Sequence, residues 1–240
     1  MSEILDHQGS YAKAATLEFF RNVYSYMFAA LGISGLVAYL FGIGEYSNFL
    51  YEVDYATMTK APSGFFYVIA FAPLIIGIVI QSAFQRLSLG VLLFLFVLYS
   101  FTMGLSLSSI FLVYNMGAIA MTFFVSAGAF GGMAILGYTT KTDLTRFGSL
   151  LYMVLIGIVI ASVVNLFIQS SGFDFLISVL GVFVFTGLTA YSMQQLKELA
   201  QDTSINTNDR NKLALIGGLQ LYILFVNLFL SLLRILGSRE

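Results

Sequence analysis

The chain has 240 residues, of which 59% are hydrophobic and only 10% are charged, and its mean hydropathy is +0.91. A soluble domain would carry about 25% charged residues, so the composition predicts one integral membrane domain, residues 1–240. The absence of cysteine excludes disulfides, thiolate nucleophiles and cysteine-ligated metals. The net charge of −1 and the lack of a basic patch argue against nucleic acid as a partner.

Seven apolar runs are each long enough to cross a bilayer, because about 20 helical residues span the ~30 Å hydrocarbon core. An all-α fold of seven transmembrane helices is therefore expected. The predicted spans are Asn22–Phe41, Gly64–Gln81, Gly90–Val113, Gly117–Tyr138, Phe147–Ile168, Phe173–Gln194 and Leu213–Leu236. In the fourth span, Gly128 and Gly132 have the spacing of a tight helix–helix contact.

The segments between the spans indicate the orientation. Residues 1–21 are expected to form a cytoplasmic segment and residues 195–212 a cytoplasmic loop. Eight cations then lie inside and three outside, which is the bias of the positive-inside rule. The inner cations are Lys13, Arg21, Arg86, Lys141, Arg146, Lys197, Arg210 and Lys212, and the outer ones are Lys60, Arg234 and Arg239. The N-terminus is therefore predicted inside and, after seven spans, the C-terminus outside.

The last apolar stretch, Gly217–Arg234, carries a thin polar stripe. At 100° per residue, four polar side chains and one leucine fall within one narrow arc of the helix. They are Gln220, Leu224, Asn227, Ser231 and Arg234. Polar residues within a membrane face the bundle interior, so we interpret this helix as central, with the other six around it. The alternative is a peripheral helix whose polar side touches one neighbour.

Two expectations follow for residues on this stripe. Asn227 is predicted to lie buried between helices and to hydrogen-bond across them. Arg234 is expected at the same membrane boundary as Asp174, because the sixth and seventh spans run antiparallel; the two side chains either form an ion pair or each extend to water.

The residues provide no enzyme chemistry. The single histidine, His7, lies outside every span, so an intramembrane serine hydrolase would lack its base. No H-E-x-x-H motif, metal-ligand cluster or glycine-rich phosphate loop is present, and no span has a carboxylate at its middle. We expect no catalytic residues, no cofactor and no bound metal.

Four stretches resemble the Bax inhibitor family, the transmembrane Bax inhibitor motif proteins, in a bacterial form. They are MGLSLSSIF from Met103, GYTTKTDLTRFGSLL from Gly137, FVFTGLTAYSMQQLK from Phe183 and LYILFVNLFLSLLRILG from Leu221. The resemblance implies six helices around a central seventh, a pH-sensitive calcium leak, and roles in stress survival and membrane protein quality control. It also implies a multi-pass protein of the bacterial inner membrane.

The chain departs from this family at its pH sensor. Members with a sensor carry an aspartate after a tyrosine in helix six, but here Tyr191 is followed by Ser192. The second aspartate corresponds to Leu224, which lies on the polar stripe, or to Ile223 by a count back from Asn227. Two close carboxylates in a low dielectric share a proton and can hold a divalent cation. A hydroxyl and a leucine can do neither.

The leading hypothesis is therefore a cation leak, with calcium as the family's ion, that lacks the two-aspartate sensor. Its candidate core or pore residues are Gln220, Asn227, Ser231, Arg234, Ser192 and Tyr191. The alternative is a non-conducting regulator that binds other membrane proteins, such as a quality-control protease. In both cases the protein is expected to be embedded in the lipid bilayer.

Overall fold

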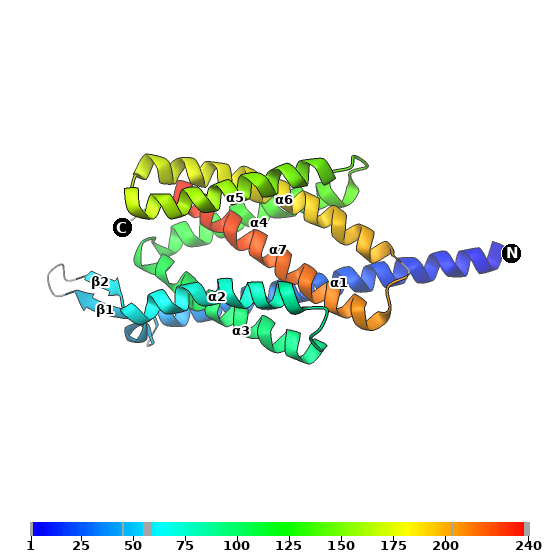
Figure 1. Cartoon of the computed structure of the whole chain (residues 1–240), viewed down its shortest axis with the longest axis horizontal. Coiled ribbons are helices and arrows are strands. Elements are labelled where there is room, and N and C mark those ends of the chain that lie inside the picture. Colours follow the sequence, from blue (N-terminus) through cyan, green and yellow to red (C-terminus); the bar gives the residue numbers. More distant parts are fainter. Residues whose placement is uncertain (1, 45, 55–58, 203, 238–240) are drawn as a thin grey trace. The chain divides into compact units, whose positions relative to one another are not determined.

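The computed structural model describes residues 2–44, 46–54, 59–202 and 204–237 (Figure 1). Side chains are described from residue 14 onward, with gaps at 45, 54–59 and 203. The side chains of His7, Lys13 and Arg239, which were named above, lie outside these ranges.

The described chain is almost entirely helical. Its helices are α1 (Ser2–Gly42), α2 (Gly64–Ala83), α3 (Leu89–Leu107), α4 (Met116–Thr139), α5 (Thr145–Ile168), α6 (Ser171–Gln201) and α7 (Thr207–Leu236), with 3-10 turns η1 (Ser47–Phe49) and η2 (Ser108–Leu112). Within the described residues seven helices are long and apolar enough to cross a membrane. The predicted all-α fold with seven membrane-spanning helices is confirmed.

Side-chain caps explain where several helices begin. Ser63, Ser88, Asn115 and Ser170 each accept a hydrogen bond from the backbone N–H three residues later, at the starts of α2, α3, α4 and α6. These polar side chains satisfy N–H groups that have no partner inside the helix. At the end of α5, Gln169 adopts a left-handed conformation with φ of 54°. This conformation stops the helix and allows α6 to start two residues later.

Helices α6 and α7 are longer than the spans predicted for them. α6 has 31 residues and, at ~1.5 Å per residue, extends beyond a hydrocarbon core of ~30 Å. Within the predicted cytoplasmic loop 195–212, α6 continues to Gln201 and α7 begins at Thr207; the cytoplasmic location of this segment stays a prediction. Polar residues such as Gln195 and Glu198 continue the helix, since they are good helix formers once outside the apolar layer.

The connection between α1 and α2 contains a structure that the hydropathy pattern did not predict. Strands β1 (Tyr51–Asp54) and β2 (Thr59–Pro62) pair antiparallel, with Tyr51 opposite Pro62 and Asp54 opposite Thr59. This hairpin follows η1 and lies at the end of the α1–α2 pair where α2 begins (Figure 1).

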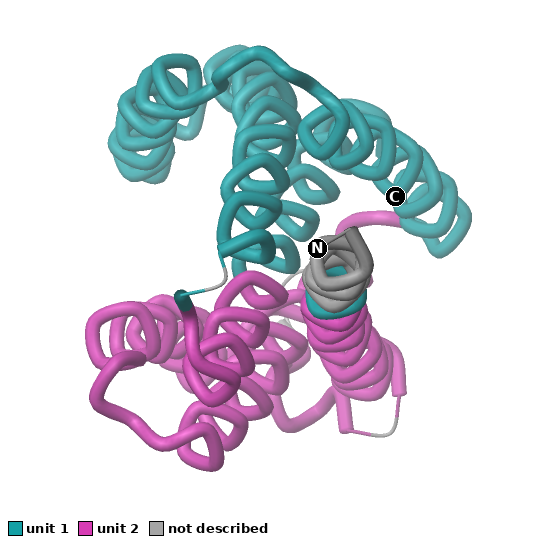
Figure 2. Tube along the Cα trace, turned by 90° about the vertical axis from the view of Figure 1, so that its right-hand side faces the viewer, with its two compact units in different colours: residues 1–17, 115–204, 220–239 teal, residues 18–114, 205–219, 240 magenta. Residues whose placement is uncertain are grey.

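The chain divides into two compact units, which Figure 2 colours separately. Unit 1 comprises residues 1–17, 115–204 and 220–239, and unit 2 comprises residues 18–114, 205–219 and 240. In unit 1, α6 packs against both α4 and α5, and in unit 2, α2 packs against α3. Helix α7 belongs to both units, and the single domain predicted over 1–240 stays a prediction.

Helix α7 is the most buried of the seven apolar helices. In its most hydrophobic window 67% of the residues are buried, against 50% in α6 and 11% in α5. Its first half meets α1 in unit 2, where a Cβ on Gly218 would lie 2.7 Å from the carbonyl oxygen of Val23. Its second half packs in unit 1, where Phe225 contacts Phe123 and Phe130 of α4 with ring centroids 5.4 and 5.6 Å apart. This burial is what a central helix would have, and the arrangement of six helices around α7 stays a prediction.

The small residues of α4 do not form the contact that their spacing predicted. A Cβ on Gly128 or Gly132 would meet no atom within 4 Å. The close approach occurs at Gly137 instead, where a Cβ would collide with the backbone of Ala190 on α6. A small residue permits close packing, but the neighbouring helix decides which small residue is used.

Candidate functional site

The polar stripe of α7 faces α6 along a line that we call the α6–α7 seam. The seam is defined by Asp174, Gly181 and Ser192 on α6, and Gln220, Ser231 and Arg234 on α7. Its contacts run antiparallel along the two helices, as expected for neighbours joined by a short loop. Polar side chains on both helices thus meet inside unit 1, where lipid does not separate them.

One end of the seam is held by an amide and a hydroxyl. Gln220 Nε2 donates a hydrogen bond of 2.9 Å to Ser192 Oγ, and Ser192 is completely buried. The same nitrogen lies 3.5 Å from the Oη of Tyr152 on α5. Gln220 therefore links α7 to both α6 and α5 at the position where the resemblance placed the first sensor residue.

The other end of the seam carries charge. Arg234 Nη1 lies 3.8 Å from Asp174 Oδ1, and both side chains are partly exposed. Of the two expected outcomes, the structure has the ion pair. Exposed pairs of this length typically contribute ~0–1 kcal/mol, so this contact orients the ends of the helices more than it stabilises the fold.

Between the two ends the helices touch closely. A Cβ on Gly181 would lie 2.6 Å from Ser231 Oγ, and Ser231 donates to the Asn227 carbonyl oxygen of its own helix at 2.8 Å. Glycine at this position therefore allows α7 to approach α6. The predicted seam residue Ser231 is buried in this contact.

Asn227 behaves differently from the prediction. Its Nδ2 donates to the carbonyl oxygen of Ile223 at 2.8 Å, which is a bond within α7, and the residue is only half-buried. The expectation of a buried amide that bonds across helices was wrong, because the carbonyl four residues earlier is within reach of the side chain. Leu224, the replaced sensor position, is buried.

Tyr191 lies beside the seam and organises α5 against α6. Its Oη accepts a hydrogen bond of 2.7 Å from Gln195 Nε2, and its ring packs edge to face on Tyr152 with centroids 6.3 Å apart. A Cβ on Gly148 would lie 2.5 Å from this ring, so α5 approaches α6 closely at this glycine.

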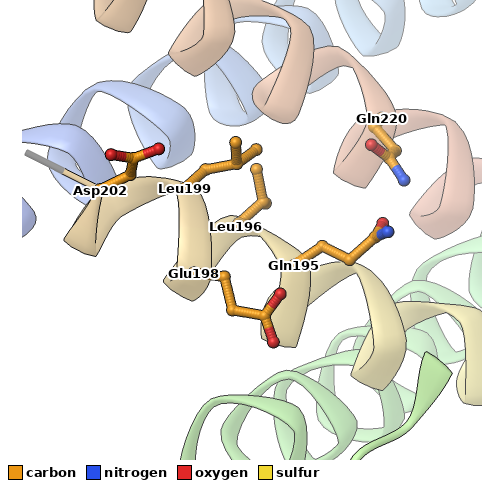
Figure 3. A pocket seen from close by; sticks show the side chains of 6 residues that line it. All are labelled: Gln195, Leu196, Glu198, Leu199, Asp202 and Gln220. Carbon is orange, nitrogen blue, oxygen red and sulfur yellow. The ribbon is translucent and has the colours of Figure 1, made fainter. Parts of the chain in front are cut away.

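A pocket of about 360 Å³ opens next to Gln220, and it is lined by Gln195, Leu196, Glu198, Leu199, Asp202 and Gln220. Figure 3 shows the Gln195 side chain extending toward Gln220, while Leu196 and Leu199 point to the side of α6 that faces away from the Glu198 carboxylate. The pocket therefore lies between polar groups near the C-terminal end of α6 and the end of the seam at Gln220. Of the described residues, no three His, Asp or Glu side chains gather closely enough to hold a metal ion.

Sequence reasoning missed three residues of this region. Tyr152 is one of many aromatic residues in an apolar helix, and nothing in its spacing marks it. Gln195 had a local signal, because it lies four residues after Tyr191 and so on the same face of the helix. Gln194 has a different role: its Oε1 accepts from Leu144 N and its Nε2 donates to Thr142 O, each at 2.8 Å.

Comparison with known proteins agrees with this architecture. The family model described as inhibitor of apoptosis-promoting Bax1 matches residues 16–240. An uncharacterized protein of Borreliella burgdorferi is 50% identical over 161 residues, which cover 67% of this chain and 69% of that protein. The inner membrane protein YbhL of Escherichia coli K12 is 49% identical over 170 residues, 70% of this chain and 73% of that protein. An uncharacterized protein of Rickettsia prowazekii is 40% identical over 220 residues, 91% of this chain and 88% of that protein.

Proposed function

Because this chain belongs to the Bax inhibitor family and is a multi-pass membrane protein, we propose that it is a cation leak, with calcium as its ion, and not an enzyme. The observation that carries the proposal is the pocket that ends at Gln220, whose amide holds the buried hydroxyl of Ser192 at 2.9 Å. We place the protein in a bacterial inner membrane, the location in the name of the YbhL relative, with the N-terminus inside.

The chemistry of the pocket supports a cation. Oxygen atoms can replace part of a cation's hydration shell in selective pores. The amides of Gln195 and Gln220 provide such atoms in the lining of the pocket, and the hydroxyls of Ser192 and Tyr152 lie next to Gln220. Glu198 and Asp202 also line the pocket and carry carboxylates. Acidic groups that line a cleft raise the local concentration of cations.

The seam supports a leak without the family's pH sensor. Ser192 and Leu224 stand where the resemblance places two aspartates, and neither side chain ionises. In this proposal Gln220 and Ser192 line the path, and conduction along it does not require a change of protonation at either position.

One observation favours the alternative function, a non-conducting regulator that binds other membrane proteins. Ser192 and Leu224 are both buried, and Gln220 already bonds Ser192, so the seam is closed as it stands. A permanently closed seam would hold α6 and α7 together as a rigid scaffold for a partner.

Calcium uptake into liposomes that contain the purified protein distinguishes the two functions. The natural protein should admit calcium, and Gln220→Leu should reduce uptake severalfold, because leucine offers no oxygen to the ion. The matched control is Ser162→Ala on α5, where the lost hydroxyl donates only to its own helix at Ile158 O; its uptake should be unchanged.

The two contrary results have different meanings. No uptake by the natural protein would favour the regulator. Uptake by the natural protein that Gln220→Leu leaves unchanged would show that ions pass elsewhere in the bundle.

A further inference from the structure

The connection between α1 and α2 has one side that is fixed to the helices. Leu50 and Tyr51 are buried and pack in one apolar cluster with Val37, Phe66 and Leu105 from α1, α2 and α3. The Oη of Tyr51 and the Oγ of Ser108 form a buried hydrogen bond of 2.5 Å. Burial raises the pKa of the Tyr51 phenol above its usual value, an effect that the bond to Ser108 partly offsets. The hairpin is thus anchored to unit 2 through its first strand.

The same connection also exposes apolar side chains. Phe49 is 72% exposed, Tyr46 52% and Val53 47%. A segment of this length in water would not normally present two aromatic rings and a valine together. Something apolar is therefore expected to cover them.

The adjoining helix ends also carry exposed aromatic rings. Tyr39 in the last turn of α1, and Phe65 and Tyr67 in the first turn of α2, are also exposed. These turns belong to helices whose outer surfaces face lipid. The exposed rings of the connection and of the adjoining helix ends are together called the aromatic rim: Tyr39, Tyr46, Phe49, Phe65 and Tyr67.

The rim is held in place by specific contacts. Lys60 Nζ on β2 donates a hydrogen bond of 2.8 Å to Ser47 Oγ, which ties η1 to the hairpin. The ring of Tyr46 stacks on Phe41 of α1 with centroids 5.5 Å apart and planes 29° apart. Phe49 lies in the turn that these two contacts fix.

We propose that the connection between α1 and α2 lies in the headgroup region of the bilayer, with Tyr46 and Phe49 inserted at the boundary between headgroups and acyl chains. Tyrosine and other amphipathic rings gather at this depth in membrane proteins. The charged side chain of Glu52, which is exposed, is long enough to reach water from the boundary. The position of the rim at the adjoining ends of α1 and α2, both of which are long and apolar enough to span a membrane, favours lipid over a partner protein or a second copy of this chain.

The chain is well suited to a direct test because it contains no tryptophan. Phe49→Trp places a single fluorophore on the rim, and lipids with bromine high on the acyl chain quench a tryptophan that touches them. In liposomes, the fluorescence of Phe49→Trp should be blue-shifted relative to a tryptophan in water. Brominated lipids should quench this fluorescence as strongly as they quench that of a lipid-facing control. Bromine near the chain end should quench it less than bromine near the headgroup.

Two variants calibrate the measurement. Phe167→Trp, at a residue 85% exposed near the end of α5, is the lipid-facing control. Lys141→Trp, on the exposed polar loop between α4 and α5, is the water-facing control and should be quenched by aqueous iodide. If Phe49→Trp does not fold, Tyr46→Trp reports on the same rim.

Two outcomes overturn the proposal. Quenching by iodide with no effect of brominated lipid would place the connection in water. Blue-shifted emission that neither quencher reduces would mean that protein covers the rim, and a dependence on the protein-to-lipid ratio would identify a second copy. None of these results depends on whether the protein conducts ions.

Discussion

The hydroxyl of Ser231 on α7 occupies the space where a side chain at Gly181 on α6 would stand, since a Cβ on Gly181 would lie 2.6 Å from Ser231 Oγ. This contact lies between the Ser192–Gln220 hydrogen bond and the Asp174–Arg234 ion pair. The separation of α6 and α7 is therefore set by one glycine and one small polar residue.

Gly181→Ala should destabilise the protein. The added methyl group forces α7 away from α6, and overpacking of this kind costs ~1–3 kcal/mol. Thermal unfolding in detergent measures the loss, and the double substitution Gly181→Ala with Ser231→Gly should recover part of it. Gly157→Ala on α5, where a Cβ meets nothing within 4 Å, is the control and should not be destabilising. Equal stability of the two single variants would mean that α6 and α7 are not in contact at this point.

Gln194→Leu should loosen the loop between α4 and α5. The natural amide bonds Leu144 N and Thr142 O at the same time, so the variant loses two hydrogen bonds at ~0.5–1.5 kcal/mol each. Hydrogen exchange at the Leu144 amide should accelerate, and thermal unfolding should occur at a lower temperature. Gln195→Leu, which removes one bond from an exposed side chain, should change the exchange at Leu144 little. Faster exchange in both variants would show that the loop is held by the end of α6 as a whole.

Installing the two missing acids should make ion flux depend on pH. The natural protein has no titratable side chain at Ser192 or Leu224, so its calcium uptake should vary little from about pH 6 to 8, where a proton shared by two acids would be released. Ser192→Asp with Leu224→Asp should introduce that dependence. Leu224→Asp alone should fold worst because it buries a lone carboxylate, whereas Ser192→Asp retains an amide donor in Gln220.

The matched control for this experiment is Ser192→Asn with Leu224→Asn, which has nearly the same shape and no titratable group. Uptake by this variant should stay insensitive to pH. Steep pH dependence in the natural protein would place the sensor on other residues.

The predicted orientation can be tested by labelling, because the chain has no native cysteine. Single cysteines at Asn48, in η1, and at Ser204, after α6, should react with membrane-impermeant reagents from opposite sides of the membrane. The eight-to-three distribution of cations motivates this expectation. Labelling of both sites from one side would contradict a seven-span topology.

The sequence alone determined the number, order and approximate limits of the membrane-spanning helices. A span depends on its own length and apolar content, which are local properties of the chain. The polar stripe of α7 was also visible, because helical periodicity places Gln220 and Ser231 on one face before any partner is known.

Only the tertiary structure decided what each polar group bonds. Gln220 and Asn227 lie on the same stripe, yet Gln220 bonds Ser192 on α6 while Asn227 bonds Ile223 within its own helix. Likewise, Gly128 and Gly132 have the spacing of a contact, but α6 approaches α4 at Gly137. Periodicity states which side of a helix a residue occupies. Whether a neighbouring helix offers a hydrogen-bonding or packing partner at the same level along the helix axis is a separate question. It depends on how side chains far apart in the sequence, such as Tyr152 and Gln220, pack together.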